Sequence, residues 1–174
     1  MSKYNLKIVR KKTALIFTGI AAGILSGIVK FGWEVPFPPR TPVRDANNPP
    51  QILLEKLGFS FQQAHLSYTY NSNSRPIMSF IVHFGFSIFF ALLYTFLVEK
   101  WAIIKVWGGA AFGIVVFVLF HEIIMPIMGV VPAPWNQPWQ EHLSEFFGHI
   151  VWFWTIEIVR RDLRNRLTHE SDPT

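Results

Sequence analysis

Apolar residues gather in four long runs, which are separated by polar or proline-rich segments. The runs cover residues 13–31, 77–98, 106–125 and 142–159, and the last two are polar at one end. Each is close to the roughly 20 residues that a helix needs to cross the hydrocarbon core of a bilayer. The pattern predicts an all-α, polytopic membrane protein, in which residues 1–174 form a single membrane domain built on a four-transmembrane-helix bundle.

The longest connection, residues 32–76, is expected to lie outside the membrane. It opens with a proline-rich stretch, residues 34–42, which favours extended backbone over helix. A short helix should follow, because Asn48 can cap it, Pro49 and Pro50 suit its first turn, and Gly58 suits its end. Its leucines crowd one side, so we expect an exterior helix at the membrane interface. Residues 59–75 show no pattern that assigns a structure.

The fourth run continues into a charged segment with helical spacing. Glu157 and Arg161, and then Asp162 and Arg166, are separated by four residues and so can pair along one helix face. We therefore expect a cytoplasmic helical extension that ends near Leu167 and is held by these two structural ion pairs.

The formal net charge of +5 raises the question of nucleic-acid binding, but the positions of the basic residues give a better explanation. Eleven of the sixteen Lys and Arg residues would lie on one side of the membrane if both termini were cytoplasmic. This distribution follows the positive-inside rule. It predicts cytoplasmic termini, the lipid bilayer as partner and no nucleic-acid partner. The residues are Lys3, Lys7, Arg10, Lys11, Lys12, Lys100, Lys105, Arg160, Arg161, Arg164 and Arg166.

The first run has features of a retained helix. It is longer than the apolar core of a secretory signal and lacks a small-residue cleavage pattern. Gly19, Gly23 and Gly27 recur every four residues, which allows another helix to approach closely. That neighbour could belong to the same chain or to a homo-oligomer. The chain has no cysteine, which removes disulfides and thiolate chemistry from consideration.

Ionisable residues interrupt the last three runs and point to function. His83, His121, Glu122, Glu145 and His149 lie within apolar sequence, where a charge at the bilayer centre costs roughly 2.5–3.5 kcal/mol. The three histidines all fall roughly 8–11 Å below the outer ends of their runs. Such groups persist where they face one another or water. We therefore predict a shared His/Glu cluster in the outer half of the bundle, with Glu34 at its mouth.

Three interpretations of this cluster remain open. It could handle protons or ions, since imidazole titrates near pH 6.5 and couples to a neighbouring carboxylate. Alternatively, His83, His121, Glu145 and His149 could bind zinc or iron, or a bis-histidine haem. In the third interpretation the groups only hydrogen-bond between helices and fix their packing. No phosphate-binding loop or nucleophile elbow is present, so the sequence does not decide whether the protein is an enzyme.

Two segments closely resemble the YagU family of bacterial inner-membrane proteins: residues 30–43 (KFGWEVPFPPRTPV) and residues 148–173. The resemblance extends through His83, through His121 with Pro126 after it, and through Glu145 and His149. It implies location in the bacterial inner membrane and an association with acid tolerance. It implies no biochemical activity, because none is established for the family.

Overall fold

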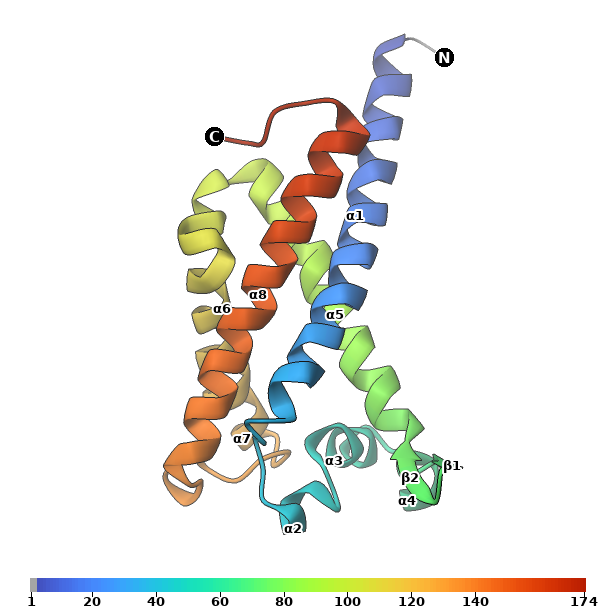
Figure 1. Ribbon diagram of the computed structural model, residues 1–174, viewed down its shortest axis with the longest axis vertical. Helices are drawn as coiled ribbons and strands as arrows, with labels where there is room; N and C mark the ends of the chain where they lie inside the picture. The colour runs from blue at the N-terminus through green and yellow to red at the C-terminus, as the bar shows by residue number, and fades with distance from the viewer. Residues whose placement is uncertain (1–2) are drawn as a thin grey trace.

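A computed structural model describes residues 3–174, with side chains described from Arg10 onward, so the predicted basic side chains of Lys3 and Lys7 lie outside the described set. Four long helical segments lie side by side (Figure 1). They are α1 (Lys3–Glu34), α5 (Ile77–Lys100), the broken segment made of η1 (Ala102–Gly109), α6 (Ala110–Val116), η2 (Phe117–Ile124) and α7 (Met125–Ile127), and α8 (Trp139–Thr168). A short 3₁₀ turn, η3 (Pro134–Asn136), precedes α8.

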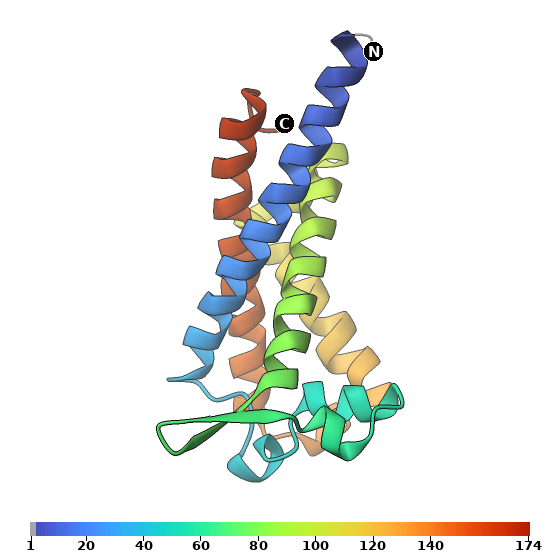
Figure 2. The same cartoon turned by 90° about the vertical axis from the view of Figure 1, so that its right-hand side faces the viewer.

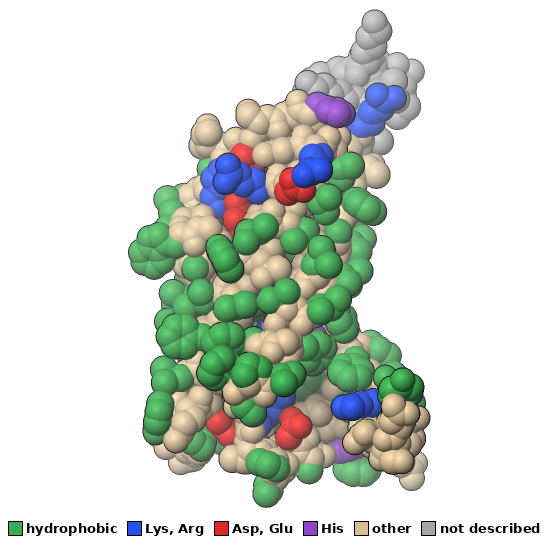
Figure 3. Space-filling view, in the orientation of Figure 1, with side chains coloured by type: hydrophobic (Ala, Val, Ile, Leu, Met, Phe, Trp, Pro, Cys, Tyr) green, Lys and Arg blue, Asp and Glu red, His purple; other side chains and the backbone are tan. Residues whose placement is uncertain are grey.

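Three of these segments are long and apolar enough to cross a membrane: Arg10–Glu34, Ile77–Lys100 and Ala102–Ile127. They correspond to the first three predicted spans. Hydrophobic side chains cover the middle of one face, and charged side chains gather toward both ends (Figure 3). The predicted fourth span lies within α8, whose mean hydropathy is lowered by its many charged residues. Both chain ends lie at the same end of the bundle (Figure 1).

The glycines of α1 are covered by α5 of the same chain. A Cβ atom at Gly19 would lie 2.9 Å from the Cα atom of Leu92, and one at Gly23 would lie 2.5 Å from the Cα atom of Ile88. At Gly27 the side chain of Phe84 is 3.0 Å away. The close approach that these glycines allow is therefore made within the chain, and their face is not left open for a second copy.

A second line of small residues reinforces this antiparallel contact. Thr18, Ala22 and Ser26 on α1 are fully buried, as are Ala91 and Thr95 on α5. The hydroxyls of Ser26 and Ser87 lie 3.2 Å apart, and Ser87 donates to the carbonyl of Gly23 at 2.7 Å. Small side chains at four-residue spacing on both helices let the two backbones pack tightly, as in other helix pairs in membranes.

Aromatic side chains fill the middle of the bundle. Phe90, Tyr94, Trp152 and Phe153 are almost completely buried and form the main core with Ile156. Their rings meet mostly edge to face, with centroids 5.7 Å apart for Phe90 and Trp152 and 5.8 Å apart for Tyr94 and Phe153. This core separates the polar groups at the two ends of the bundle.

The connection between α1 and α5 forms a cap over one end of the bundle (Figure 2). It contains α2 (Pro42–Asp45), α3 (Pro49–Lys56), α4 (Phe61–Ala64) and the antiparallel hairpin β1 (Ser67–Tyr70) with β2 (Asn73–Pro76). The predicted short helix is confirmed as α3, with a capping box at Asn48, two prolines in its first turn and a left-handed Gly58 after it.

The expectation of an all-α fold is wrong at the hairpin. Asn71 and Ser72 have φ values of 48° and 60°, the left-handed pair of a tight hairpin turn. All but the last of the eight strand residues are exposed, so the strands show no alternation of buried and exposed positions. The usual sequence signature of a half-buried strand is therefore absent.

At the other end of the bundle, one predicted ion pair is wrong. Glu157 pairs with Arg160, at 2.6 Å, and accepts a hydrogen bond from Tyr94 at 3.0 Å; Arg161 is exposed. Glu157 pairs with Arg160, three residues later, because the side chain of Arg160 points into the bundle and is completely buried. Arg166 lies 2.8 Å from Asp162, the other predicted partner.

The chain after α8 folds back over this end. Asp172 lies 2.7 Å from Arg160 and also contacts Lys105, while Glu170 pairs with Lys11 at 2.8 Å and with Arg164 at 3.2 Å. The tail therefore links α8 to α1 and η1.

Candidate functional site: a buried chain of histidines and carboxylates

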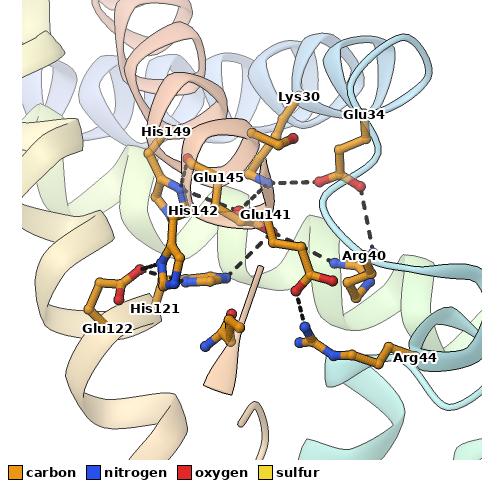
Figure 4. Close-up of polar contacts among 12 residues, drawn as sticks. Lys30, Glu34, Arg40, Arg44, His121, Glu122, Glu141, His142, Glu145 and His149 are labelled. Atoms are coloured by element: carbon orange, nitrogen blue, oxygen red, sulfur yellow. Dashed lines mark hydrogen bonds and ion pairs between the residues drawn. The ribbon is translucent and has the colours of Figure 1, made fainter. Parts of the chain in front are cut away.

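Polar side chains from three long segments meet beneath the cap (Figure 4). The last turn of α1 supplies Lys30 and Glu34, η2 supplies His121 and Glu122, and the first half of α8 supplies the others. The α8 residues are Glu141, His142, Glu145 and His149, and the connection around α2 adds Arg40 and Arg44.

Glu145 occupies the centre of this group, and its side chain is only 6% exposed. Its carboxylate lies 3.2 Å from Lys30 Nζ, 3.7 Å from Arg40 Nη1, 3.8 Å from His121 Nε2 and 3.5 Å from His149 Nδ1. A carboxylate in such a place remains ionised only when cations compensate for the lost hydration. Here Lys30 and Arg40 provide that compensation.

The charges beside Glu145 balance. Lys30 also lies 2.7 Å from Glu34, and Arg40 lies 3.8 Å from the other oxygen of Glu34. Lys30, Arg40, Glu34 and Glu145 therefore form a quartet of two cations and two anions. Any additional proton in their midst gives the group a net positive charge.

His121 and Glu122 are neighbours in sequence, and both turn toward α8. In a regular α-helix they would be rotated by about 100° from each other. Here they lie in η2, a π-helix: the N–H of Met125 bonds to the carbonyl of Phe120, five residues earlier. A wider turn rotates less per residue, and π-helical turns are frequent at functional sites. This geometry brings His121 toward Glu145 and Glu122 toward His142.

Glu122 links two imidazoles. Its Oε1 atom lies 3.2 Å from Nδ1 of His121 and 2.8 Å from Nδ1 of His142. The other ring nitrogen of His142 lies 2.9 Å from the carbonyl oxygen of Pro134, which can only accept. Both nitrogens of His142 thus face oxygen acceptors, whereas a neutral imidazole has a single N–H to donate. His142 is also the outermost of these groups, 27% exposed.

Glu141 ties the cap to the site. It accepts a hydrogen bond from the backbone N–H of Thr41 at 3.2 Å and is in close contact with Arg44. Burial and the nearby charge of Arg40 lower the pKa of Arg44 from its ordinary value, while Glu145 opposes that shift. Arg40 and Arg44 together hold the start of the connecting segment against α8.

His83 lies apart from the other histidines. Its Nε2 atom donates to the carbonyl of Gly27 at 3.1 Å, and its ring stacks on Phe31 with centroids 3.7 Å apart. One cluster containing all three histidines stays a prediction for His83, because its Nε2 is hydrogen-bonded to α1 while its ring lines the same cavity as His121 and His149. His121 and His149 do approach each other, with ring centroids 6.4 Å apart.

These histidines share one cavity, of about 570 Å³. His83 lines one wall, and His121, Glu145 and His149 line another. Among the described residues, no group of three or more His, Asp or Glu side chains is arranged to hold a metal ion. The four predicted metal ligands do not converge, because His83 is held by Gly27 and Lys30 occupies the cation position beside Glu145.

The sequence analysis did not assign Lys30, Arg40 or Arg44 to this site. The sequence could have indicated Lys30, because it lies four residues before Glu34 at the end of an apolar run and can pair with it along one helix face. The two arginines lie in the proline-rich segment, where no periodicity predicts which helix their side chains reach.

The comparisons with known proteins agree with a membrane location. The model of a protein family of unknown function (DUF1440) matches residues 24–158. The chain is also 41% identical, over 90% of its own length and 87% of the relative's, to "Inner membrane protein YagU" of Escherichia coli (strain K12). No solved structure matches.

Proposed function

This chain belongs to the YagU family (DUF1440) and is an integral inner-membrane protein, and from that premise we propose that it binds and relays protons at the exterior face of the membrane. The relay consists of His142, Glu122, His121, Glu145 and His149. Glu34 and Lys30 complete the charge balance at its inner end.

The topology that we propose has four crossings and cytoplasmic termini. α8 runs antiparallel to η2 and packs closely along α1, which supports its assignment as a fourth transmembrane helix. Basic residues concentrate at the end of the bundle that carries both termini, which the positive-inside rule assigns to the cytoplasm. The cap, α2 to β2, then lies outside, and α8 continues past the membrane as the cytoplasmic extension.

The observation that carries the proposal is the position of Glu122 between two imidazoles. A proton shared by His142 and Glu122 can pass to His121, because the same carboxylate oxygen faces Nδ1 of both rings. Proton transfer between such groups requires contact of this kind, directly or through one water. The opposite side of the His121 ring then faces Glu145 at 3.8 Å. A chain of ionisable side chains thus extends from the rim toward the buried quartet, and its last step, at 3.8 Å, has to shorten for proton transfer.

The relay is expected to end at the cavity. Beyond His149 the interior is aromatic, with Trp152 and Phe153 packed against Phe90. A proton that arrives at His121 or His149 adds positive charge beside Glu145, competes with Lys30 and Arg40 for this carboxylate, and so loosens α1 and the cap from α8. Exterior acidity would in this way change how firmly the cap is held, which fits a contribution to acid tolerance.

The first test measures proton uptake from the exterior solution by the protein in proteoliposomes, with a pH-sensitive dye on the exterior side. Glu122→Gln should remove the response to an exterior acid pulse, because a carboxamide cannot carry the shared proton. The matched control is Glu55→Gln, which removes a carboxylate paired with His65 in the cap, away from the relay. An unchanged response in Glu122→Gln, or equal losses in both variants, would contradict the proposal.

A second variant addresses the inner end of the relay. His149→Ala combined with Glu145→Gln should also abolish the response. The packing interpretation has its own support, since all charged groups of the quartet are paired. It predicts that these variants lower the thermal stability and leave proton uptake by the surviving folded protein unchanged. Elemental analysis and a visible spectrum of the purified protein test the zinc, iron and haem alternatives.

A further inference from the structure

The cavity beneath the cap lies where two long segments separate. α5 meets η2 through aromatic contacts, with ring centroids 5.8 Å apart for Phe86 and Phe120 and 5.0 Å apart for Phe90 and Phe120. Toward the cap, the two segments move apart, and α3 lies between their ends (Figures 1 and 2). α5 packs closely against α1 and α3, whereas η2 and α7 are not among its main neighbours.

The cap closes the cavity on the aqueous side. Asn48, the cap of α3, accepts a hydrogen bond from Ser79 on α5 at 2.9 Å, which fixes α3 over the opening. Leu53 of α3, and Leu57 just after it, line the cavity. Their apolar side chains face the same space as Val82 on α5.

The mouth of the cavity faces sideways, toward the bilayer. Among the exposed residues that line the cavity, three lie on or directly after the long helical segments: Phe86 is 38% exposed, Ile124 36% and Met128 40%, while Leu57, at 64%, lies in the cap. Phe86 and Ile124 belong to two different candidate membrane spans. An opening between two candidate spans, with apolar residues at its edge, would face lipid chains in a membrane.

The walls indicate an amphiphilic occupant. Most of the lining is apolar, and the volume of about 570 Å³ falls in the range of roughly 300–1,000 Å³ that is usual for cavities enclosing small ligands. Burying hydrocarbon chain in such a space is favourable, at roughly 25 cal/mol per Å² of apolar surface removed from water. The charged wall offers no free cation, because Lys30 and Arg40 are already paired with Glu34 and Glu145.

A cation without an ion-pair partner lies at the rim. Arg75, in β2 two residues before α5, lines the cavity and is exposed, and no carboxylate contacts it among the described residues. Lys56, at the end of α3, likewise has no acidic partner in the described part of the chain; it lies beside Gly129, next to Met128 at the mouth. A guanidinium at the membrane surface matches the phosphate of a lipid, which it can contact through two N–H groups.

We infer that this cavity binds an anionic phospholipid of the membrane, with an acyl chain between α5 and η2 and the phosphate at Arg75. The lipid would share the cavity with His121, Glu145 and His149 of the relay, but its binding requires no proton transfer by these groups, and the variants that test it leave them unchanged.

The test adds dioleoylphosphatidylglycerol or dioleoylphosphatidylcholine to the detergent-solubilised protein and counts bound lipid by native mass spectrometry. Val82→Trp fills the cavity and should weaken binding of both lipids by roughly tenfold, about 1.4 kcal/mol. Its matched control is Ile81→Trp, the neighbouring residue on α5, which is exposed and does not line the cavity. Equal binding by the two variants would overturn the inference.

A second pair of variants tests the head group. Arg75→Gln should remove the preference for phosphatidylglycerol over phosphatidylcholine and leave chain binding intact. Arg161→Gln removes an exposed arginine at the opposite end of the bundle and should keep the preference. A preference that survives in Arg75→Gln would refute the assignment of the phosphate to this residue.

A measurement on the unmodified protein covers the case in which Val82→Trp does not fold. A phospholipid with a photoreactive acyl chain should label Phe86, Ile124 and Met125, which line the cavity. It should label Phe89 and Leu119 less, since they are exposed and lie outside the cavity. Equal labelling of both sets would indicate lipid that only surrounds the bundle and would overturn the inference.

Discussion

Lys30 lies 3.2 Å from Glu145, a residue 115 positions later in the chain, and both side chains are buried. The contact joins the end of α1 beneath the cap to the middle of the polar site on α8. Replacing either residue alone should lower the free energy of unfolding, because it leaves the buried charge of the other without its main partner.

Lys30→Met should destabilise the protein by about 3–5 kcal/mol, the usual cost of leaving a buried charge without its partner. Glu145→Gln in the same chain should restore much of this loss, because no uncompensated charge remains. Thermal unfolding in detergent measures both effects. Lys12→Met, at an exposed position near the inner end of α1, should change the midpoint little. If the double variant is less stable than Lys30→Met, the pair does not act through charge compensation.

Gly23→Ala should destabilise the bundle, because the added Cβ atom would lie 2.5 Å from the Cα atom of Ile88 and must push α5 away from α1. Gly85→Ala is the control: it lies on α5 with no atom within 4 Å of the new Cβ, and should stabilise the helix by about 0.5–1 kcal/mol. Thermal unfolding compares them. Similar midpoints for the two variants would show that α1 and α5 do not pack through this glycine.

The C-terminal fold-back should weaken in acid. Burial alone would raise the pKa of Asp172, but hydrogen bonds from Lys105 and Arg160 outweigh it and hold the pKa below its ordinary value of 3.8. Because the pKa of Asp172 is lower in the folded protein, its contribution to the stability of the fold-back is complete above pH 3.8. This contribution is lost as the pH falls through the lower pKa of the folded state.

Hydrogen exchange along the end of α8 measures this change. Asp172→Asn should show the faster exchange already at neutral pH and little further change below pH 3.8. Asp162→Asn serves as control, since its pair with Arg166 is largely exposed and should contribute little. Protection that is independent of Asp172 at neutral pH would contradict the prediction.

Asn48→Ala should loosen the cap. It removes the capping box of α3 and the bond from Ser79, at a cost of about 0.5–2 kcal/mol for the cap alone. Hydrogen exchange should rise across α3. Ser60→Ala removes the same kind of capping box from α4, which is exposed, and should leave α3 protected. Equal exchange in α3 for both variants would show that Asn48 does not hold the cap.

Local sequence signals account for much of the bundle and for part of the site. The length of the apolar runs predicted the three candidate spans, and the capping residues predicted α3, because both depend on neighbours in the chain. Glu145 and His149 are four residues apart and so share one helix face, which is also a local property. Arg40 is different: its partner Glu145 lies more than one hundred positions later, on α8, and no local pattern encodes that contact.

Two departures from regular geometry were also invisible in the sequence. The π-helical turn changes the direction of Glu122, whereas a spacing argument assumes a constant rotation per residue. The hairpin before α5 is held by the left-handed turn at Asn71 and Ser72, while its exposed strands lack any apolar alternation.

The charged residues of α8 bear on how the protein is assembled. Glu145 and Glu157 are twelve residues apart on α8, so they are separated by roughly 18 Å along the helix axis. This distance is shorter than the hydrocarbon core of a bilayer, which is about 30 Å thick. As a nascent segment on its own, α8 would therefore expose carboxylates to lipid. We therefore expect the translocon to release α8 into the bilayer only when α1 is already in place. Insertion of the last helix would then depend on its contacts with the first.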